Sequence, residues 1–171
     1  EIDADDQFIF KKNVICSIGR LTHQKNFIEL LNFVREINKS SLEKFNFIII
    51  GEGEKRSELK NFIKRNNLYN CYLLGFKKNP YKYLARSKLY ISTSLWEEPG
   101  HTLLEAGYLN VPILSSNCPN GPNEIIKNEI TGLKYELHNK QDLLIKFKKF
   151  LSLSDPDLFF LKKNMKRIVL D

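Results

Sequence analysis

Compact apolar runs alternate along the chain with longer segments in which apolar residues recur at helical spacing. Residues 13–18 and 45–50 are largely apolar runs, and a glycine follows each of them. Runs of this length without polar alternation are typical of parallel strands that are buried on both faces of a sheet. The segment 27–38 instead carries apolar residues three and four positions apart, which predicts an amphipathic helix.

Predicted strands and helices alternate from residue 13 onward. The strands are predicted at 13–18, 45–50, 72–76, 89–93, 111–116 and 131–135. The helices are predicted at 27–38, 54–66, 81–87, 101–109, from 123, at 142–153 and at 157–170, with Asp155 and Pro156 separating the last two. This alternation predicts an α/β fold with a doubly wound, Rossmann-like parallel sheet of about six strands and right-handed crossovers.

The segment after the fourth predicted strand combines a helix start with an acidic residue in an apolar setting. Pro99 and Gly100 break the chain and predict a helix start next to them. The helix is apolar on nearly every side, which predicts burial, yet Glu105 lies within it on the same face as His101 and Thr102. Free N–H groups and the macrodipole attract anions to a helix N-terminus. The pattern therefore indicates a phosphate at the helix start and a carboxylate one turn later that accepts hydrogen bonds from hydroxyl groups.

Glu97 and Glu105 are separated by seven residues, and the stretch 97–106 reads E-E-P-G-H-T-L-L-E-A. This stretch resembles the E-x7-E signature of retaining glycosyltransferases of the GT-B fold, the glycogen-synthase-like and sucrose-synthase-like group, whose common form is E-G-F-G-x-x-x-x-E-A. Glu98 and Pro99 replace the usual Gly and Phe, which predicts a different shape for the loop before the helix. Acids that only complement the helix dipole are the alternative interpretation of Glu97 and Glu98.

A pair of cations follows the first predicted strand. Arg20 and Lys25 lie within the stretch 19–26, which reads G-R-L-T-H-Q-K-N. Open α/β sheets bind ligands beyond the carboxyl ends of their strands, and an Arg with a Lys suits a diphosphate. The stretch resembles the G-R-L-x-x-x-K-G motif of the same family, whose Arg and Lys grip the nucleotide diphosphate, with Asn26 in place of the last Gly. Two solvated loop cations are the alternative.

Two further turns resemble family elements that pass near the nucleotide base. Gly51-Glu52-Gly53 follows the second predicted strand and resembles the family's G-x-G-P/E turn, while the full G-x-G-x-x-G of dinucleotide-binding domains is missing. This omission argues against a dehydrogenase-type domain. Phe76 and Lys77 follow the third strand and are candidates for packing against the base or ribose. Glycines that serve only a tight turn, and a surface lysine, are the alternatives.

The resemblance implies a role for each matched residue. Arg20 and Lys25 would neutralise the diphosphate as negative charge builds on the leaving group, and Glu97 would face the donor sugar, so these three are the predicted catalytic residues. Segment 121–126 resembles the family's G-x-x-E-I-I segment beside that sugar. Glu105 would accept hydrogen bonds from the ribose. The predicted nucleotide-binding residues are Gly19, Arg20, Lys25, Gly51, Gly53, Phe76, Lys77, Glu105 and, through backbone N–H groups, Gly100, His101, Thr102 and Leu103.

The resemblance covers residues 13–153 and corresponds to the second of the two domains of a GT-B enzyme. It implies that residues 1–12 are the remnant of an interdomain linker and that residues 13–171 are the nucleotide-sugar donor-binding domain, with the N-terminal acceptor domain absent. The donor would be a UDP- or GDP-linked sugar, with no cofactor and no metal. The acceptor would be a glycan or a lipid-linked molecule, as in the synthesis of lipopolysaccharide or capsule.

The parent enzyme would act in the cytoplasm, in peripheral association with the inner face of a membrane, and the isolated domain would be inactive alone. A non-catalytic module that binds a nucleotide diphosphate is the alternative.

Composition limits the remaining possibilities. The 171 residues suit one domain, and neither a transmembrane run nor a signal peptide is recognisable. The net charge of +7 fits either a surface for anionic partners or a chain rich in Lys and Asn throughout, and no aromatic–basic motif points to nucleic acid. Cys16 and Cys71 lie in predicted strands and are expected to be buried free thiols in a reducing compartment. Cys and His are too few for a metal cluster.

Overall fold

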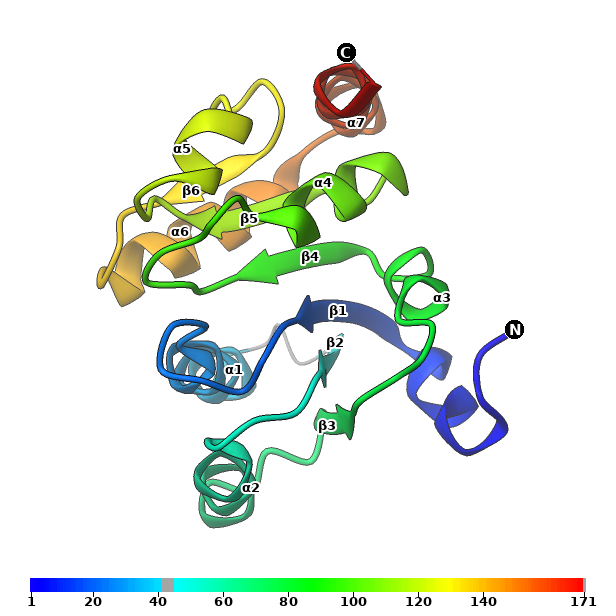
Figure 1. The fold of residues 1–171 in the computed structure, drawn as a ribbon, viewed down its shortest axis with the longest axis vertical. Helices are drawn as coiled ribbons and strands as arrows, with labels where there is room; N and C mark the ends of the chain where they lie inside the picture. The colour runs from blue at the N-terminus through cyan, green and yellow to red at the C-terminus, as the bar shows by residue number, and fades with distance from the viewer. Residues whose placement is uncertain (41–44, 171) are drawn as a thin grey trace.

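The computed structural model describes residues 1–40 and 45–170. Six parallel strands form one sheet in the order β3-β2-β1-β4-β5-β6 (Figure 1). The predicted α/β class and parallel doubly wound sheet are confirmed. Residues 41–44 and 171, which fall within the predicted domain 13–171, lie outside the described residues. The strands are β1 (Asn13–Ile18), β2 (Phe45–Ile50), β3 (Cys71–Gly75), β4 (Leu89–Ser92), β5 (Ile113–Ser116) and β6 (Leu133–Tyr135).

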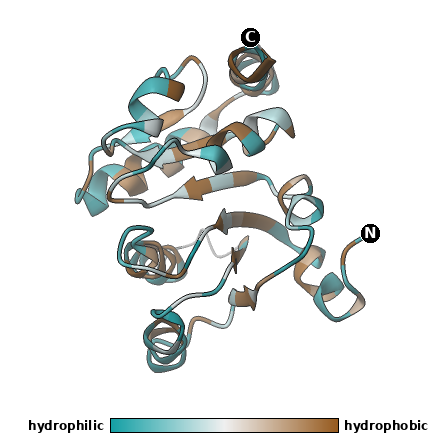
Figure 2. Cartoon of the chain, in the orientation of Figure 1, coloured by the Kyte–Doolittle hydropathy of each residue, from teal (hydrophilic) through white to brown (hydrophobic). Residues whose placement is uncertain are grey.

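Helices cover both faces of the sheet because successive strand residues point to opposite sides. Ile15 and Phe47 pack with α1, α2 and α6 in one apolar cluster, while Cys16 and Ile48 pack with η1, α3, α4 and α7 in another. Figure 2 shows this arrangement as largely brown strands between helices that carry much teal. The helices are η1 (3-10, Ala4–Lys11), α1 (Phe27–Asn38), α2 (Arg56–Arg65), α3 (Tyr81–Leu84), α4 (His101–Tyr108), α5 (Gly121–Ile125), α6 (Lys140–Ser152) and α7 (Asp155–Leu170).

Most element bounds follow the prediction, and the differences have local causes. The helix 27–38 and the strand 45–50 are found at the predicted bounds as α1 and β2. β5 begins at Ile113 rather than at residue 111, because Pro112 has no N–H to donate to the sheet. The carbonyl of Pro112 still accepts a hydrogen bond from the N–H of Tyr90 at 2.9 Å.

Two helix predictions are partly wrong. Asp155 and Pro156 do not separate α6 from α7 but form the first residues of α7, because proline fits the first turn of a helix. α4 is not buried on all sides: Leu103 and Ala106 lie in the core, while Tyr108 is exposed. The small side chains of α4 therefore mark one buried face, against which α7 packs.

The first twelve residues pack against the sheet. Ile2 and Ile9 are buried in the cluster that contains β1 and β2, and the side-chain amide of Asn46 donates to the carbonyl of Ile9 at 2.6 Å. Residues 1–12 thus share a core with the rest of the chain, and the boundary at residue 13 stays a prediction. Their origin as part of an interdomain linker stays a prediction.

Candidate functional site

The order of the strands creates a crevice beyond the carboxyl ends of β1 and β4. β2 and β3 extend the sheet on one side of β1, whereas β4, β5 and β6 extend it on the other. The loops after β1 and β4 therefore leave in opposite directions, and such a switch point is where open α/β sheets bind ligands. Residues 19–26 form the loop after β1, and residues 93–100 form the loop after β4.

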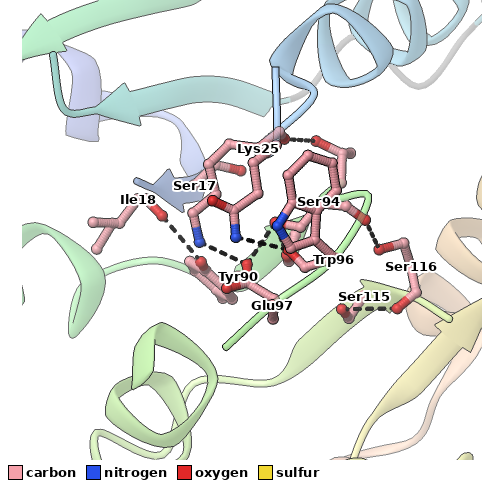
Figure 3. Close-up of polar contacts among 12 residues, drawn as sticks. Ser17, Ile18, Lys25, Tyr90, Ser94, Trp96, Glu97, Ser115 and Ser116 are labelled. Carbon is pink, nitrogen blue, oxygen red and sulfur yellow. Dashed lines mark hydrogen bonds and ion pairs between the residues drawn. The ribbon is translucent and has the colours of Figure 1, made fainter. Parts of the chain in front are cut away.

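An ion pair joins the two loops at this switch point. The Nζ atom of Lys25 donates to Oε1 of Glu97 at 2.6 Å, with side chains 15% and 5% exposed (Figure 3). The hydroxyl of Ser94 donates to the same carboxylate oxygen at 2.5 Å. Two of the three predicted catalytic residues are thus in direct contact, although 72 positions separate them in the sequence.

Backbone contacts hold the two loops in register around that pair. The N–H of Leu95 donates to the carbonyl of Gln24 at 2.8 Å, and the side-chain amide of Gln24 donates to the carbonyl of Trp96 at 3.0 Å. The Thr93 hydroxyl donates to the carbonyls of Lys25 and Asn26, each at 3.1 Å. These contacts therefore hold together the two loops that carry Lys25 and Glu97.

A third loop approaches the ion pair from the other side. Glu97 forms an isolated parallel bridge with Asn120, immediately before α5. A Cβ atom added to Gly121 would lie 2.9 Å from the carbonyl oxygen of Pro99 and 3.2 Å from Cα of Gly100, so these backbones are in close contact. Segment 121–126 was predicted to lie beside the donor sugar, and its start adjoins Glu97 in the structure.

The start of α4 lies on the same side of the sheet as the end of β1. Gly100 is the N-cap residue of α4, with φ at 84°, and Thr102 follows in the first turn. Tyr90 connects the two elements: its buried hydroxyl lies beside Thr102 and donates to the carbonyl of Ile18 at 3.3 Å. Burial raises the pKa of the Tyr90 phenol, so it remains a neutral donor. Tyr90 thus links the end of β1 to the start of α4, whereas binding of one diphosphate by Arg20 and the start of α4 stays a prediction.

The backbone donors predicted at the start of α4 are not all free. The N–H of Leu103 donates to the carbonyl of Gly100 at 2.9 Å, so the turn itself satisfies it. The Leu103 side chain is fully buried in the core. The N–H of Leu103 is thus satisfied within the turn, and phosphate binding by the N–H groups of Gly100, His101, Thr102 and Leu103 stays a prediction. His101 itself is exposed.

Glu105 lies one turn into α4 and partly faces solvent. Its Oε1 accepts a hydrogen bond from the hydroxyl of Tyr81 at 3.1 Å. Glu105 is therefore not a buried, unpaired acid, although the predicted helix suggested one. Its role as an acceptor for ribose hydroxyl groups stays a prediction.

Arg20 lines a separate part of the crevice. A hollow of about 340 Å³ lies over the ends of β1 and β2. Its lining includes Gly19, Arg20, Gly51, Phe76 and Lys77. Five of the predicted nucleotide-binding residues are therefore brought together by the structure. Phe76 is 75% exposed, so most of its ring is accessible.

The glycines of the 51–53 turn are required by the close approach of the 19–26 loop. Gly51 has φ at 145°, and a Cβ atom there would lie 1.9 Å from the carbonyl oxygen of Gly19. A Cβ atom on Gly53 would lie 2.5 Å from the carbonyl oxygen of Leu21. A structural need for both glycines is thus established, and any contact with the nucleotide base stays a prediction.

Lys77 is engaged by the N-terminal segment. Its ammonium contacts Asp3 at 3.1 Å and Asp6 at 2.5 Å, and both acids also accept hydrogen bonds from the buried Tyr83 hydroxyl. Lys82 forms a further ion pair with Asp3. The described contacts of Lys77 therefore point toward η1, while its stem lines the hollow beside Phe76.

Several polar residues of the site were missed by the sequence analysis. The hydroxyl of Ser116 donates to the carbonyl of Ser94 at 2.6 Å, and that of Ser17 donates to the carbonyl of Ile91 at 2.5 Å (Figure 3). These serines lie at the ends of predicted strands that otherwise are apolar. A hydroxyl at the carboxyl end of each of several parallel strands was the signal available in the sequence.

The cysteines are buried and free, as predicted for Cys16 and Cys71, and Cys118 is buried as well. Burial raises the pKa of the Cys71 thiol to about 12, so it stays protonated. Within residues 1–40 and 45–170, no group of three His, Cys, Asp or Glu side chains could hold a metal ion. No helix in that part of the chain combines the length and apolar character that a membrane span requires.

Comparison with known proteins relates this chain to a family. The sequence from residue 1 to residue 167 matches the family described as glycosyl transferases group 1. An uncharacterised glycosyltransferase of Methanocaldococcus jannaschii is 39% identical over 144 residues, which cover 81% of this chain and 35% of that protein. The UDP-Gal:alpha-D-GlcNAc-diphosphoundecaprenol alpha-1,3-galactosyltransferase of Escherichia coli is 34% identical over 131 residues, covering 74% of this chain and 33% of that enzyme.

Solved structures show the same fold. HepE of Anabaena, in complex with UDP-glucose, superposes with a TM-score of 0.84 at 20% identity, over 96% of this chain and 46% of HepE. TarM of Staphylococcus aureus, in a complex that contains UDP, gives a TM-score of 0.85 at 24% identity, over 93% of this chain and 32% of TarM. The chain spans about a third of the length of the curated relatives it matches. With nearly its whole length matched by the family, the chain belongs to the group 1 glycosyl transferases.

Proposed function

We propose that this chain is the nucleotide-sugar donor-binding domain of a retaining glycosyltransferase. The observation that carries the proposal is the contact between Lys25 and Glu97, because it brings the family's cationic motif and its E-x7-E motif together at the switch point of the sheet. A role in an NAD-dependent dehydrogenase lacks both the glycine motif and the family match.

In this proposal the residues divide the work between the diphosphate and the sugar. Arg20 and Lys25 hold the diphosphate and stabilise the charge that builds on it when its bond to the sugar breaks. The start of α4 adds backbone donors and a helix dipole to the same phosphate groups. Glu97 orients the Lys25 ammonium and presents its carboxylate to the sugar, either by accepting hydroxyl hydrogen bonds or by stabilising positive charge on the ring.

The hollow beside Arg20 would take the nucleoside. Phe76 offers an exposed aromatic face to the base, and Glu105 accepts hydrogen bonds from the ribose. We favour UDP over GDP as the carrier, because HepE is described with UDP-glucose and the E. coli relative is named for a UDP-linked galactose. A sugar nucleotide of this kind needs neither a metal nor another cofactor in the proposed site, since Arg20 and Lys25 supply the positive charge.

The acceptor would be bound by another part of a longer protein. The chain spans about a third of its curated relatives, one of which is named for a diphosphoundecaprenol acceptor. We infer that the parent enzyme transfers a sugar to a glycan or to a lipid-linked acceptor at the cytoplasmic face of a membrane. Residues 1–12 would then connect the two domains, and this chain alone would bind the donor without completing the transfer.

Calorimetric titration of the 171-residue chain with UDP and with GDP tests the proposal. Arg20→Ala and Lys25→Ala should each weaken the binding of UDP, because each removes a charge from the diphosphate. Lys60→Ala is the matched control, since this exposed lysine lies on α2 and lines none of the described crevice. Equal affinity for UDP in all three variants would refute the assignment of the site, and failure of the unmodified chain to bind either nucleotide would refute the function.

A further inference from the structure

The outer face of α7 combines exposed apolar groups with cations, which is unusual for a helix surface that faces solvent. Its inner side is anchored, because Leu161 and Met165 are buried and the side chain of Met165 lies close against Gly107 of α4. On the opposite side Phe159, Phe160 and Leu170 are 65%, 52% and 64% exposed. Figure 1 shows α7 at the edge of the molecule, outside the layer formed by α4.

Cations surround these exposed apolar groups. α7 carries acids only in its first turn, whereas its later turns carry Lys162, Lys163, Lys166 and Arg167. The Nζ atom of Lys163 lies 5.9 Å from the ring centre of Phe159. The cations and the apolar groups are thus mixed on one surface rather than separated.

Tyr108 of α4 extends this surface beyond α7. Its ring is 57% exposed, and the Nζ atom of Lys166 lies 5.8 Å from its centre. We call the combined surface the basic aromatic face, defined by Tyr108, Phe159, Phe160, Lys163, Lys166, Arg167 and Leu170. Among the residues that the structure describes, no carboxylate forms an ion pair with its three cations.

A hollow of about 540 Å³ opens on this face. Its lining combines Lys166 and Arg167 with the apolar groups of Phe159 and Leu170. One site therefore offers cations for a phosphate group next to apolar surface for a hydrocarbon chain.

We propose that the basic aromatic face binds the surface of an anionic lipid bilayer. Exposed aromatic rings fit the headgroup layer, and Lys and Arg beside them bind lipid phosphates. The rings and Arg167 would suit a protein partner as well, but the two lysines favour the bilayer, because lysine is depleted at the centre of protein–protein interfaces. The negative charge of the bilayer would complement the three unpaired cations of this face. The inference is independent of the nucleotide site, since it uses none of the residues proposed to bind donor.

Co-sedimentation of the 171-residue chain with vesicles tests this surface. The chain is expected to bind vesicles of phosphatidylcholine mixed with phosphatidylglycerol, and not vesicles of phosphatidylcholine alone. Binding should weaken as salt is added, because counter-ions screen the lipid charge. Replacing a cation by a neutral residue should weaken the binding roughly five-fold, from the attraction of one Lys or Arg to an anionic surface.

The informative variant is Lys163→Glu with Arg167→Glu, since both side chains are exposed. A second variant, Phe159→Ser with Phe160→Ser, removes the rings and keeps the charges. The charge control is Lys60→Glu with Lys64→Glu, which reverses two exposed cations of α2, and the ring control is Tyr69→Ser, which removes an exposed ring elsewhere. Both test variants should lose vesicle binding, while both controls keep it and all four bind UDP like the unmodified chain.

Three results would overturn the proposal. One is an absence of binding to anionic vesicles, and another is a loss of binding as large in the controls as in the test variants. The third is a stable dimer in light scattering that Phe159→Ser with Phe160→Ser disrupts, because the face would then bind a second copy of the chain. Loss of UDP binding in the unmodified chain would refute the proposed function and leave the vesicle result unaffected.

Discussion

Replacing Lys25 by Met separates its two proposed roles, because Met keeps much of the apolar stem and removes the ammonium. In the structure the ammonium is the charged partner of Glu97, at 2.6 Å. Without it, the hydroxyl of Ser94 is the remaining side-chain donor described for that carboxylate. The side chain of Glu97 is only 5% exposed, so its charge would be left nearly buried with one neutral partner.

The expected loss of stability is large. Removing one partner of a buried ion pair typically costs about 3–5 kcal/mol, because the other charge stays desolvated. A domain has a free energy of unfolding of about 5–15 kcal/mol, so Lys25→Met should be folded but clearly weakened. The loss of a charge-assisted hydrogen bond to the diphosphate, about 1.5–3 kcal/mol, should also raise the Kd for UDP about 10- to 150-fold.

Two further variants distinguish the loss of stability from the loss of binding. Lys25→Met combined with Glu97→Gln removes both charges, and most of the stability should return because no charge is left buried. Its affinity for UDP should stay as low as in Lys25→Met. Glu97→Gln alone leaves the ammonium without its carboxylate, so UDP should bind at least as tightly as to the unmodified chain. Urea unfolding measures the stability, and calorimetric titration measures the affinity.

The reasoning fails if Lys25→Met unfolds more easily but binds UDP with unchanged affinity. Lys25 would then serve only to neutralise Glu97. It also fails if Glu97→Gln weakens UDP binding as much as Lys25→Met does, because the carboxylate would then contribute to the diphosphate site itself.

Three other predictions concern the fold around the site. Gly51→Ala should lower the free energy of unfolding by more than about 1 kcal/mol and weaken UDP binding, because the added Cβ would lie 1.9 Å from the carbonyl oxygen of Gly19. Urea unfolding measures the first effect and titration with UDP the second, and unchanged stability would contradict the close contact between the two loops. Phe147→Ala should lower the free energy of unfolding in urea by about 3–5 kcal/mol, because this fully buried ring packs against three other rings. A decrease of less than about 1 kcal/mol would contradict this and show that the core closes around the cavity. The hydrogen bond from Lys82 holds the pKa of Asp3 well below its usual range, so the ion pairs of Asp3 stabilise the fold above about pH 4, and this contribution is lost as the pH falls further. Between pH 7 and pH 3 the unfolding temperature should therefore fall less in Asp3→Asn than in the unmodified chain. Parallel plots of unfolding temperature against pH would contradict this.

The sequence was sufficient for the fold because each buried strand is a short apolar run that is closed by glycine or a polar loop. The strand 45–50 and the helix 27–38 have sharp changes of pattern at both ends, so their bounds were predicted correctly. Bounds were wrong where proline acts on the backbone, at Pro112 and Pro156, because its effect depends on which hydrogen bonds the neighbouring elements need. Burial of α4 was overestimated, since a run of small apolar residues does not say which face meets another helix.

The candidate site was likewise only partly predictable from the sequence. The resemblance of two short motifs to a known family singled out Arg20, Lys25 and Glu97, because each motif is local in the sequence. It could not pair Lys25 with Glu97 or Lys77 with Asp3, which lie 72 and 74 positions apart. Those contacts depend on the strand order, which sets β1 beside β4 and brings their loops to one edge of the sheet. Local pattern thus determined the elements and the candidate chemistry, whereas only packing decided which charges meet, because a side chain finds its partner across space and not along the chain.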